Sequence, residues 1–108
     1  MAEDAAIVFT TFPDQETARR IVRTLVEERL IACGNLVPGV ESIYRWKGAI
    51  ETSSEIFAVL KTERSRYVLL EKRLRELHPY DVPECVIIRI TDGLPDYLHW
   101  ITESLTGE

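Results

Sequence analysis

Two long extended patterns, separated by one tight-turn signal, occupy the middle of the chain. The first covers about residues 35–46 and the second about residues 51–61, and side chains alternate between two faces along both. The segment Lys47-Gly48-Ala49 between them is typical of a hairpin turn, and Pro38-Gly39 predicts a bulge or bend in the first strand. Because ordinary strands average about five to six residues, the fold must be built around an unusually long β-hairpin.

Before the hairpin, the chain shows one strand pattern and one helix pattern. The apolar run at residues 6–11 predicts a strand. Apolar residues then recur at helical spacing over about residues 15–30, and Asp14 is placed to cap the start of that helix.

After the hairpin, a second helix is expected over about residues 64–77, with Thr62 or Ser65 as its cap. Residues 85–90 are almost continuously apolar, which is typical of a central strand. A short helix follows, with four residues expected to face inward: Tyr97, Leu98, Ile101 and Leu105.

The order of these elements is β-α-β-β-α-β with a C-terminal helix, in a single domain over residues 1–108. This order predicts an α+β fold of the ferredoxin-like (split β-α-β) kind, an antiparallel sheet with helices packed on one face.

Large apolar side chains on both faces of the long hairpin do not suit a monomer. Tyr44 and Trp46 lie on one face and Ile43 on the other, and one small subunit cannot cover them all. We therefore expect a closed homo-oligomer, and a homotrimer fits sheets arranged around a shared axis. Tyr44 and Trp46 are expected at the trimer interface, with stacking on a ligand as the alternative.

Composition excludes several classes of protein. The formal net charge is −5 and basic residues are interleaved with acidic ones, which argues against a nucleic-acid partner. No apolar run reaches the roughly 18 residues of a membrane span, and the acidic N-terminus is unlike a signal peptide. Cys33 and Cys85 are too few for a disulfide framework and predict free thiols in the cytoplasm.

The stretch 77–84 joins the second helix to the last strand through two prolines. Proline fixes its own φ and keeps the preceding residue out of the α region, so the helix should end near Leu77. The resulting stiff linker presents four polar or aromatic side chains: His78, Tyr80, Asp81 and Glu84. We expect the functional site to lie at this linker.

Lys61 is expected to approach this linker and to form a polar ligand-binding pocket with Tyr80, Asp81 and Glu84 at a subunit boundary. Its ammonium group would recognise an anionic ligand, and Glu84 would pair with it or bind a cation. The alternative is a structural salt bridge that holds the hairpin to the linker.

Five short segments carry a family likeness: residues 32–39 (ACGNLVPG), 42–48 (SIYRWKG), 61–62 (KT), 78–84 (HPYDVPE) and 97–101 (YLHWI). Together they resemble the CutA divalent-cation-tolerance family over essentially the whole chain. The resemblance implies a homotrimer of ferredoxin-like subunits, similar to those of the PII signalling proteins and cytoplasmic in bacteria. It also implies tolerance to divalent metals, with copper binding in some members.

The copper ligands of those members are a Cys at the end of the first strand and two adjacent His before a Pro-Tyr pair. The corresponding positions here are Thr10, Leu77 and His78. Only His78 could serve, either as a copper or zinc ligand or as a linker residue bonded to backbone. Cys33 could supply a soft thiolate, or pack as a small apolar residue, as Cys85 could.

No nucleophile with a partner base, no Gly-rich phosphate loop and no HExxH motif occurs in the sequence. An acylphosphatase on this fold is therefore disfavoured, and no enzymatic activity is expected. The sequence predicts a non-enzymatic homotrimer in metal-ion homeostasis that weakly binds copper or another divalent cation. The alternative is a PII-like signalling or scaffold trimer that binds a small anionic ligand in its inter-subunit clefts.

Overall fold

The computed structural model describes residues 4–107 as one four-stranded antiparallel sheet with three α-helices. The elements are β1 (Ala5–Phe12), α1 (Gln15–Glu27), β2 (Cys33–Trp46), β3 (Ala49–Glu63), a 3-10 turn (Arg64–Arg66), α2 (Tyr67–Leu77), β4 (Val86–Arg89) and α3 (Pro95–Leu105). The strand order is β2-β3-β1-β4 and each neighbouring pair is antiparallel. This confirms the expected α+β fold.

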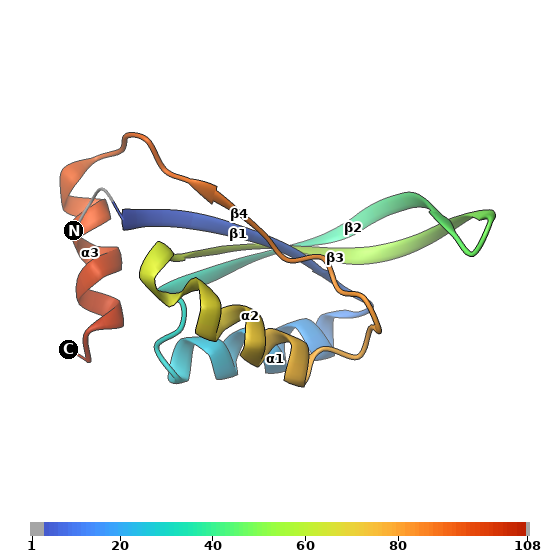
Figure 1. Ribbon diagram of the computed structural model, residues 1–108, viewed down its shortest axis with the longest axis horizontal. Coiled ribbons are helices and arrows are strands. Elements are labelled where there is room, and N and C mark those ends of the chain that lie inside the picture. The colour runs from blue at the N-terminus through green and yellow to red at the C-terminus, as the bar shows by residue number, and fades with distance from the viewer. Residues whose placement is uncertain (1–3, 108) are drawn as a thin grey trace.

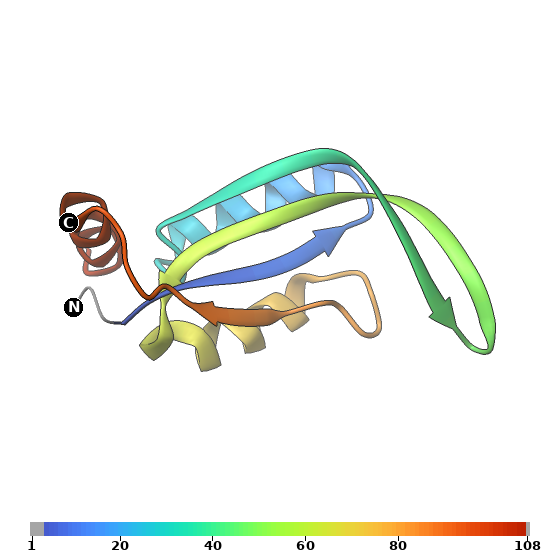
Figure 2. The ribbon, with the colours of Figure 1, turned by 90° about the horizontal axis from the view of Figure 1, so that it is seen from above.

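Helices α1 and α2 lie side by side across one face of the sheet, and α3 lies at the end of the sheet where β1 begins (Figures 1 and 2). The main core fills the space between the sheet and the first two helices. Its fully buried members include Val8, Phe12, Ile21, Leu25, Leu60, Leu70 and Leu74. No helix within residues 4–107 is both long and apolar enough to cross a membrane.

Helix α1 begins as expected but ends three residues early, at Glu27. The Asp14 carboxylate accepts a hydrogen bond from the Thr17 N–H at 2.8 Å, which confirms it as the cap. Arg29 adopts a left-handed φ of 59°, and the Leu30 N–H bonds back to the Leu25 carbonyl. The Arg29 N–H also bonds to the Val26 carbonyl. These two backbone bonds define a Schellman motif, which here forms without glycine.

Two expectations for the second half of the chain are wrong. Residues 85–90 do not form a central strand, because β4 pairs with β1 alone and lies at the sheet edge. Its continuous apolar pattern arises because Ile87 packs on the core while Val86 and Ile88 face the opposite side.

Helix α2 also lacks the side-chain cap expected from Thr62 or Ser65. The Thr62 hydroxyl instead donates to the Leu30 carbonyl at 2.7 Å. A 3-10 turn leads into the helix, and the Ser65 N–H donates to the Asp4 carboxylate. The start of α2 is therefore set by this turn and not by a cap.

The long hairpin is confirmed. Its two-residue turn has positive φ at Lys47 (50°) and Gly48 (84°), the geometry of a type I′ turn. The register shifts between Val37 and Val40, where the bulge was expected. Beyond that bulge, the hairpin projects past the helices as a two-stranded arm (Figures 1 and 2).

The face of the sheet that α1 and α2 do not cover is apolar, and we call it the open face. Strand register places apolar residues from all four strands on it, among them Ile7, Phe9, Val37, Phe57, Val59, Val86 and Ile88. The Phe9 and Phe57 rings stack at 5.3 Å near its middle. Tyr44 and Trp46 carry the same face outward along the hairpin arm, and each is 43% exposed.

Candidate functional site

The ring of His78 is buried at the end of β1, and both of its nitrogens are engaged. Nδ1 accepts from the Tyr80 N–H at 3.1 Å, so Nε2 carries the hydrogen and donates to the Thr11 carbonyl at 2.7 Å. The ring also packs between those of Phe12 and Tyr80, with centroids 5.0 and 4.7 Å away. Burial lowers the pKa of His78, which favours this neutral form.

The Tyr80 hydroxyl donates to a Glu55 carboxylate oxygen at 2.6 Å. Burial, and then this hydrogen bond to a carboxylate, raise the pKa of Tyr80 well above its usual range, so the phenol stays protonated. Register places Phe12 on the covered face and Glu55 on the open face. The linker therefore clasps the end of the sheet from both sides.

These contacts define what a metal at His78 would require. Coordination by either nitrogen would break a buried bond to backbone, at Thr11 or at Tyr80. Within residues 4–107, no three His, Cys, Asp or Glu side chains gather as a metal-binding group. The roles of His78 and Cys33 as metal ligands remain predictions, and one chain does not bring these two residues together.

The other two positions that correspond to copper ligands hold no strong ligand. Leu77 is half-buried and packs against the main core. Thr10 is fully buried, and its hydroxyl has no hydrogen-bond partner among the described residues. A neutral hydroxyl left unpaired in a core destabilises the fold by about 1–3 kcal/mol.

Thr10→Val should therefore raise the free energy of unfolding by about 1 kcal/mol, because valine keeps the shape and removes the unpaired hydroxyl. The midpoint of urea unfolding measures the change. Thr62→Val is the matched control, since the buried Thr62 hydroxyl does have a partner in the Leu30 carbonyl, and it should lower stability. Destabilisation by both substitutions would mean that Thr10 also has a partner.

The expected pocket of Lys61, Tyr80 and Glu84 is not assembled within one chain. Tyr80 contacts Glu55, which lies six residues before Lys61 on β3, or about 20 Å along an extended strand. Glu84 is exposed in the linker. Within one chain, the β3 register places Lys61 at the end of the sheet beside α3, so the pocket expected at a subunit boundary stays a prediction.

Lys61 has a different set of neighbours. Its ammonium group donates to the Asn35 side-chain oxygen at 2.7 Å and lies 5.8 Å from the centre of the Tyr97 ring. Cys33 is directly opposite Lys61 across β2 and β3, and its sulfur lies 3.8 Å from the Tyr97 hydroxyl. The structure thus places Cys33, a predicted metal ligand, beside Lys61, a residue predicted to bind an anion.

Both cysteines are free thiols, as expected from the sequence. Cys85 lies just before β4, where the Tyr67 hydroxyl donates to its carbonyl at 3.2 Å, and burial raises the pKa of its thiol. A raised pKa keeps that thiol protonated and a poor metal ligand. Cys33 is half-buried like Cys85, and it lies at the border of the open face.

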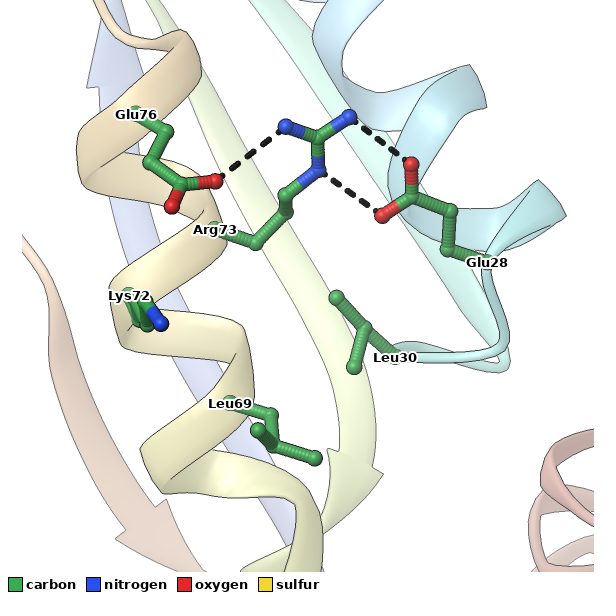
Figure 3. Close-up of a pocket in the computed structure, with 6 residues that line it drawn as sticks. All are labelled: Glu28, Leu30, Leu69, Lys72, Arg73 and Glu76. Carbon is green, nitrogen blue, oxygen red and sulfur yellow. Dashed lines mark hydrogen bonds and ion pairs between the residues drawn. The ribbon is translucent and has the colours of Figure 1, made fainter.

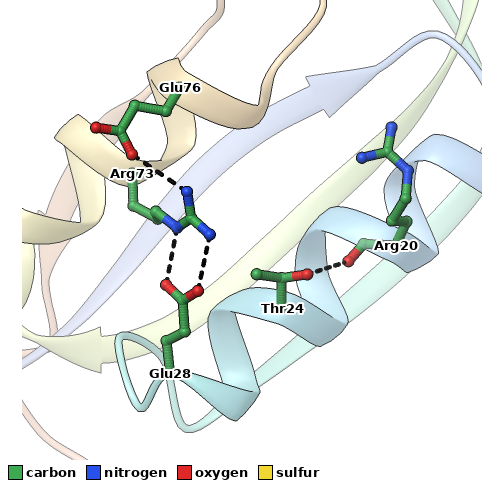
Figure 4. Close-up of polar contacts among 5 residues, drawn as sticks. All are labelled: Arg20, Thr24, Glu28, Arg73 and Glu76. Carbon is green, nitrogen blue, oxygen red and sulfur yellow. Dashed lines mark hydrogen bonds and ion pairs between the residues drawn. The ribbon is translucent and has the colours of Figure 1, made fainter.

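A shallow groove of about 240 Å³ lies between the end of α1 and α2 (Figure 3). Arg73 spans it with two bonds of 2.8 Å to the Glu28 carboxylate and one of 3.2 Å to Glu76 (Figure 4). The Arg73 bond lowers the pKa of Glu28. The charge of Arg73 is neutralised by Glu28 and Glu76, so these residues join the two helices. They leave no free charged group in the groove to bind a ligand.

Two residues that matter at these places were not singled out from the sequence: Asn35 and Glu55. Glu55 is only 8% exposed, although acidic residues in a hairpin are usually exposed. Tyr97 was expected to face inward with Leu98, Ile101 and Leu105, and this is wrong for Tyr97, which is 39% exposed beside Lys61. The signal available for Glu55 was its place in the alternating strand pattern, on the same face as Phe57. Nothing in the sequence predicts which tyrosine it meets.

The chain matches the family model described as CutA1 divalent ion tolerance protein over residues 6–104. A divalent-cation tolerance protein CutA of Thermus thermophilus is 45% identical over 98 residues, covering 91% of this chain and 95% of the relative. Another of that name, from Pyrococcus horikoshii, is 48% identical over 97 residues, covering 90% and 94%.

Solved structures agree with these relatives. The crystal structure of CutA from Xylella fastidiosa has a TM-score of 0.92 at 43% identity, covering 94% of this chain and 98% of that one. CutA1 from Oryza sativa has a TM-score of 0.93 at 34% identity, covering 97% and 96%. With the family model matching nearly the whole domain, this chain belongs to the CutA1 divalent ion tolerance family.

Proposed function

We propose that this protein supports tolerance to divalent cations as a non-enzymatic homotrimer. The match to the family model over residues 6–104 is the observation that carries the proposal. The names of the curated relatives, from bacteria and archaea alike, describe the same role. Among the described residues, the polar contacts of His78, Tyr80 and Arg73 join helices, strands and the linker of the same chain. Contacts of this kind stabilise the fold, which suits a scaffold protein.

The proposed trimer rests on the open face and the hairpin arm. A contiguous apolar surface on a small domain marks an interaction site. An isolated two-stranded hairpin is marginally stable in water, so the arm needs a surface to pack against. A second and a third copy of the chain would cover the open face and would give the arm a surface to pack against. Tyr44 and Trp46 would lie at these contacts.

We further propose that copper or another divalent cation binds only weakly. His78 must give up a backbone hydrogen bond to coordinate a metal, and this cost lowers the affinity of any site that includes it. Cys33, on the border of the open face, is the available soft ligand, and copies arranged about an axis would bring several such thiols closer. Two free thiols are compatible with the reducing cytoplasm, where we place the protein.

Complementation tests the proposed role directly. A bacterial strain that lacks its own relative should regain growth in inhibitory copper or zinc when it expresses this chain. Expression of a folded protein, checked by immunoblot and by its thermal unfolding after purification, is the control for each variant. Folded, abundant protein that leaves the strain as sensitive as before would refute the role in cation tolerance.

A further inference from the structure

Five side chains from three elements converge where α3 borders the open face. We call them the α3 border cluster: Cys33 and Asn35 from β2, Lys61 from β3, and Tyr97 and Trp100 from α3. Strand register places the first three on one face of the sheet. The contact of 3.8 Å between the Cys33 sulfur and the Tyr97 hydroxyl fixes α3 against them.

The charge of Lys61 is not neutralised by any carboxylate within residues 4–107. Lys61 is only half-exposed, and its hydrogen-bond partner is Asn35, which carries no charge. No carboxylate among the described residues lies within ion-pair distance of its ammonium group. A partly desolvated cation with only neutral partners attracts an anion.

The cluster is rich in hydrogen-bond donors. An ammonium group only donates, so Asn35 must turn its oxygen to Lys61 and its amide N–H groups away. Lys61 keeps further N–H bonds to give, and burial raises the pKa of Tyr97, which keeps its hydroxyl protonated. Such a set of donors around one positive charge matches the oxygens of a carboxylate or a phosphate.

An aromatic surface adjoins these donors. The rings of Tyr97 and Trp100 stack at 5.5 Å, and these residues are 39% and 41% exposed. Exposed, paired aromatic rings offer a flat apolar surface with little loss of side-chain entropy on binding.

We propose that the α3 border cluster binds a small anion that joins a carboxylate or phosphate to a flat apolar group. Lys61 and Asn35 hold the charged end, and Tyr97 and Trp100 pack against the flat part. This site sharpens the small-anion alternative suggested by the sequence and replaces Tyr80 and Glu84 in it. It is independent of cation tolerance, so either proposal can fail alone.

Titration with benzoate and with phenyl phosphate, followed by ¹H–¹⁵N NMR, tests the site. The chain has two tryptophans, so the indole signal of Trp100 should shift while that of Trp46 serves as an internal reference. Benzamide keeps the ring without the charge, and acetate keeps the charge without the ring. Benzamide should bind at least about tenfold more weakly, since a hydrogen bond to a charged group contributes about 1.5–3 kcal/mol. Acetate should also bind more weakly, because it cannot pack against Tyr97 and Trp100.

Lys61→Met should weaken benzoate binding at least about tenfold, because it removes the charge and keeps an unbranched apolar side chain. Lys72→Met is the matched control on the exposed surface of α2 and should change nothing. Absence of a Trp100 shift with both anions, or equal binding by Lys61→Met, would overturn the proposal. So would loss of assembly in Lys61→Met without any response to the anions, which would assign Lys61 to a contact between copies.

Discussion

Phe57→Glu should convert the protein from an oligomer to a monomer at micromolar concentration. Phe57 stacks on Phe9 in the middle of the open face, where a second copy would have to bury it. An unpaired carboxylate in that contact would have to be desolvated, which costs several kcal/mol. We expect the dissociation constant to rise at least about 100-fold, equivalent to about 2.7 kcal/mol. Sedimentation equilibrium measures it.

Val68→Glu is the matched control for this change. Val68 is 75% exposed on α2, on the covered side of the sheet, so the same charge there should leave assembly intact. The monomer made by Phe57→Glu should keep its far-ultraviolet circular dichroism, since Phe57 lies outside the main core. A wild-type protein that sediments as a monomer would contradict the proposed trimer, and an unaffected Phe57→Glu oligomer would place the interface elsewhere.

Much of the fold could be predicted from local pattern alone. The hairpin was predictable because its turn needs two positive φ values and its strands alternate between two faces on either side of the bulge at Pro38-Gly39. The cap at Asp14 was predictable because it depends on residues only three apart.

Features that depend on distant partners were not predictable in this way. An edge strand and a central strand read alike when both faces of the edge strand carry apolar groups, as β4 does. Thr62 was expected as a helix cap because such a cap is local. Its hydroxyl instead bonds the carbonyl of Leu30, a residue 32 positions away.

The candidate site shows the same division. Proline chemistry predicted that α2 ends near Leu77 and that His78 is extended, and both are confirmed. That Tyr80 would meet Glu55 while Lys61 lies about 20 Å further along β3 depends on sheet register and on how the linker wraps the edge. The partners of a polar side chain across a sheet are set by packing, and sequence spacing does not report them.

His78→Ala should destabilise the protein by about 3–5 kcal/mol, a cost typical of a large buried side chain that also leaves polar groups unpaired. The substitution removes the donor to the Thr11 carbonyl, the acceptor for the Tyr80 N–H, and the ring that packs on Phe12. Urea unfolding measures the loss. His99→Ala is the control, because the His99 side chain is 71% exposed and should cost little.

The same ring should make stability depend on pH just below neutrality. Burial lowers the pKa of His78 below its ordinary value of 6.5, although the Thr11 bond and the Glu55 charge oppose this. As the pH falls through 6.5, His78 is therefore protonated in the unfolded chain while it is still neutral in the folded chain. The free energy of unfolding should then decrease by up to about 1.4 kcal/mol per pH unit until the folded ring is protonated too.

His78→Gln separates this effect from other acid sensitivity, because glutamine can still donate to the Thr11 carbonyl but does not titrate. The loss of stability between about pH 6.5 and pH 5 should disappear in His78→Gln and persist in His99→Gln. The lowered pKa values of Asp14 and Glu28 make their own contributions fade only below their ordinary values of 3.8 and 4.5, outside that window. If wild-type stability stays flat from pH 7 to pH 5, the folded ring accepts a proton as readily as the unfolded one. The two backbone bonds of His78 would then not hold the linker in the way the geometry requires.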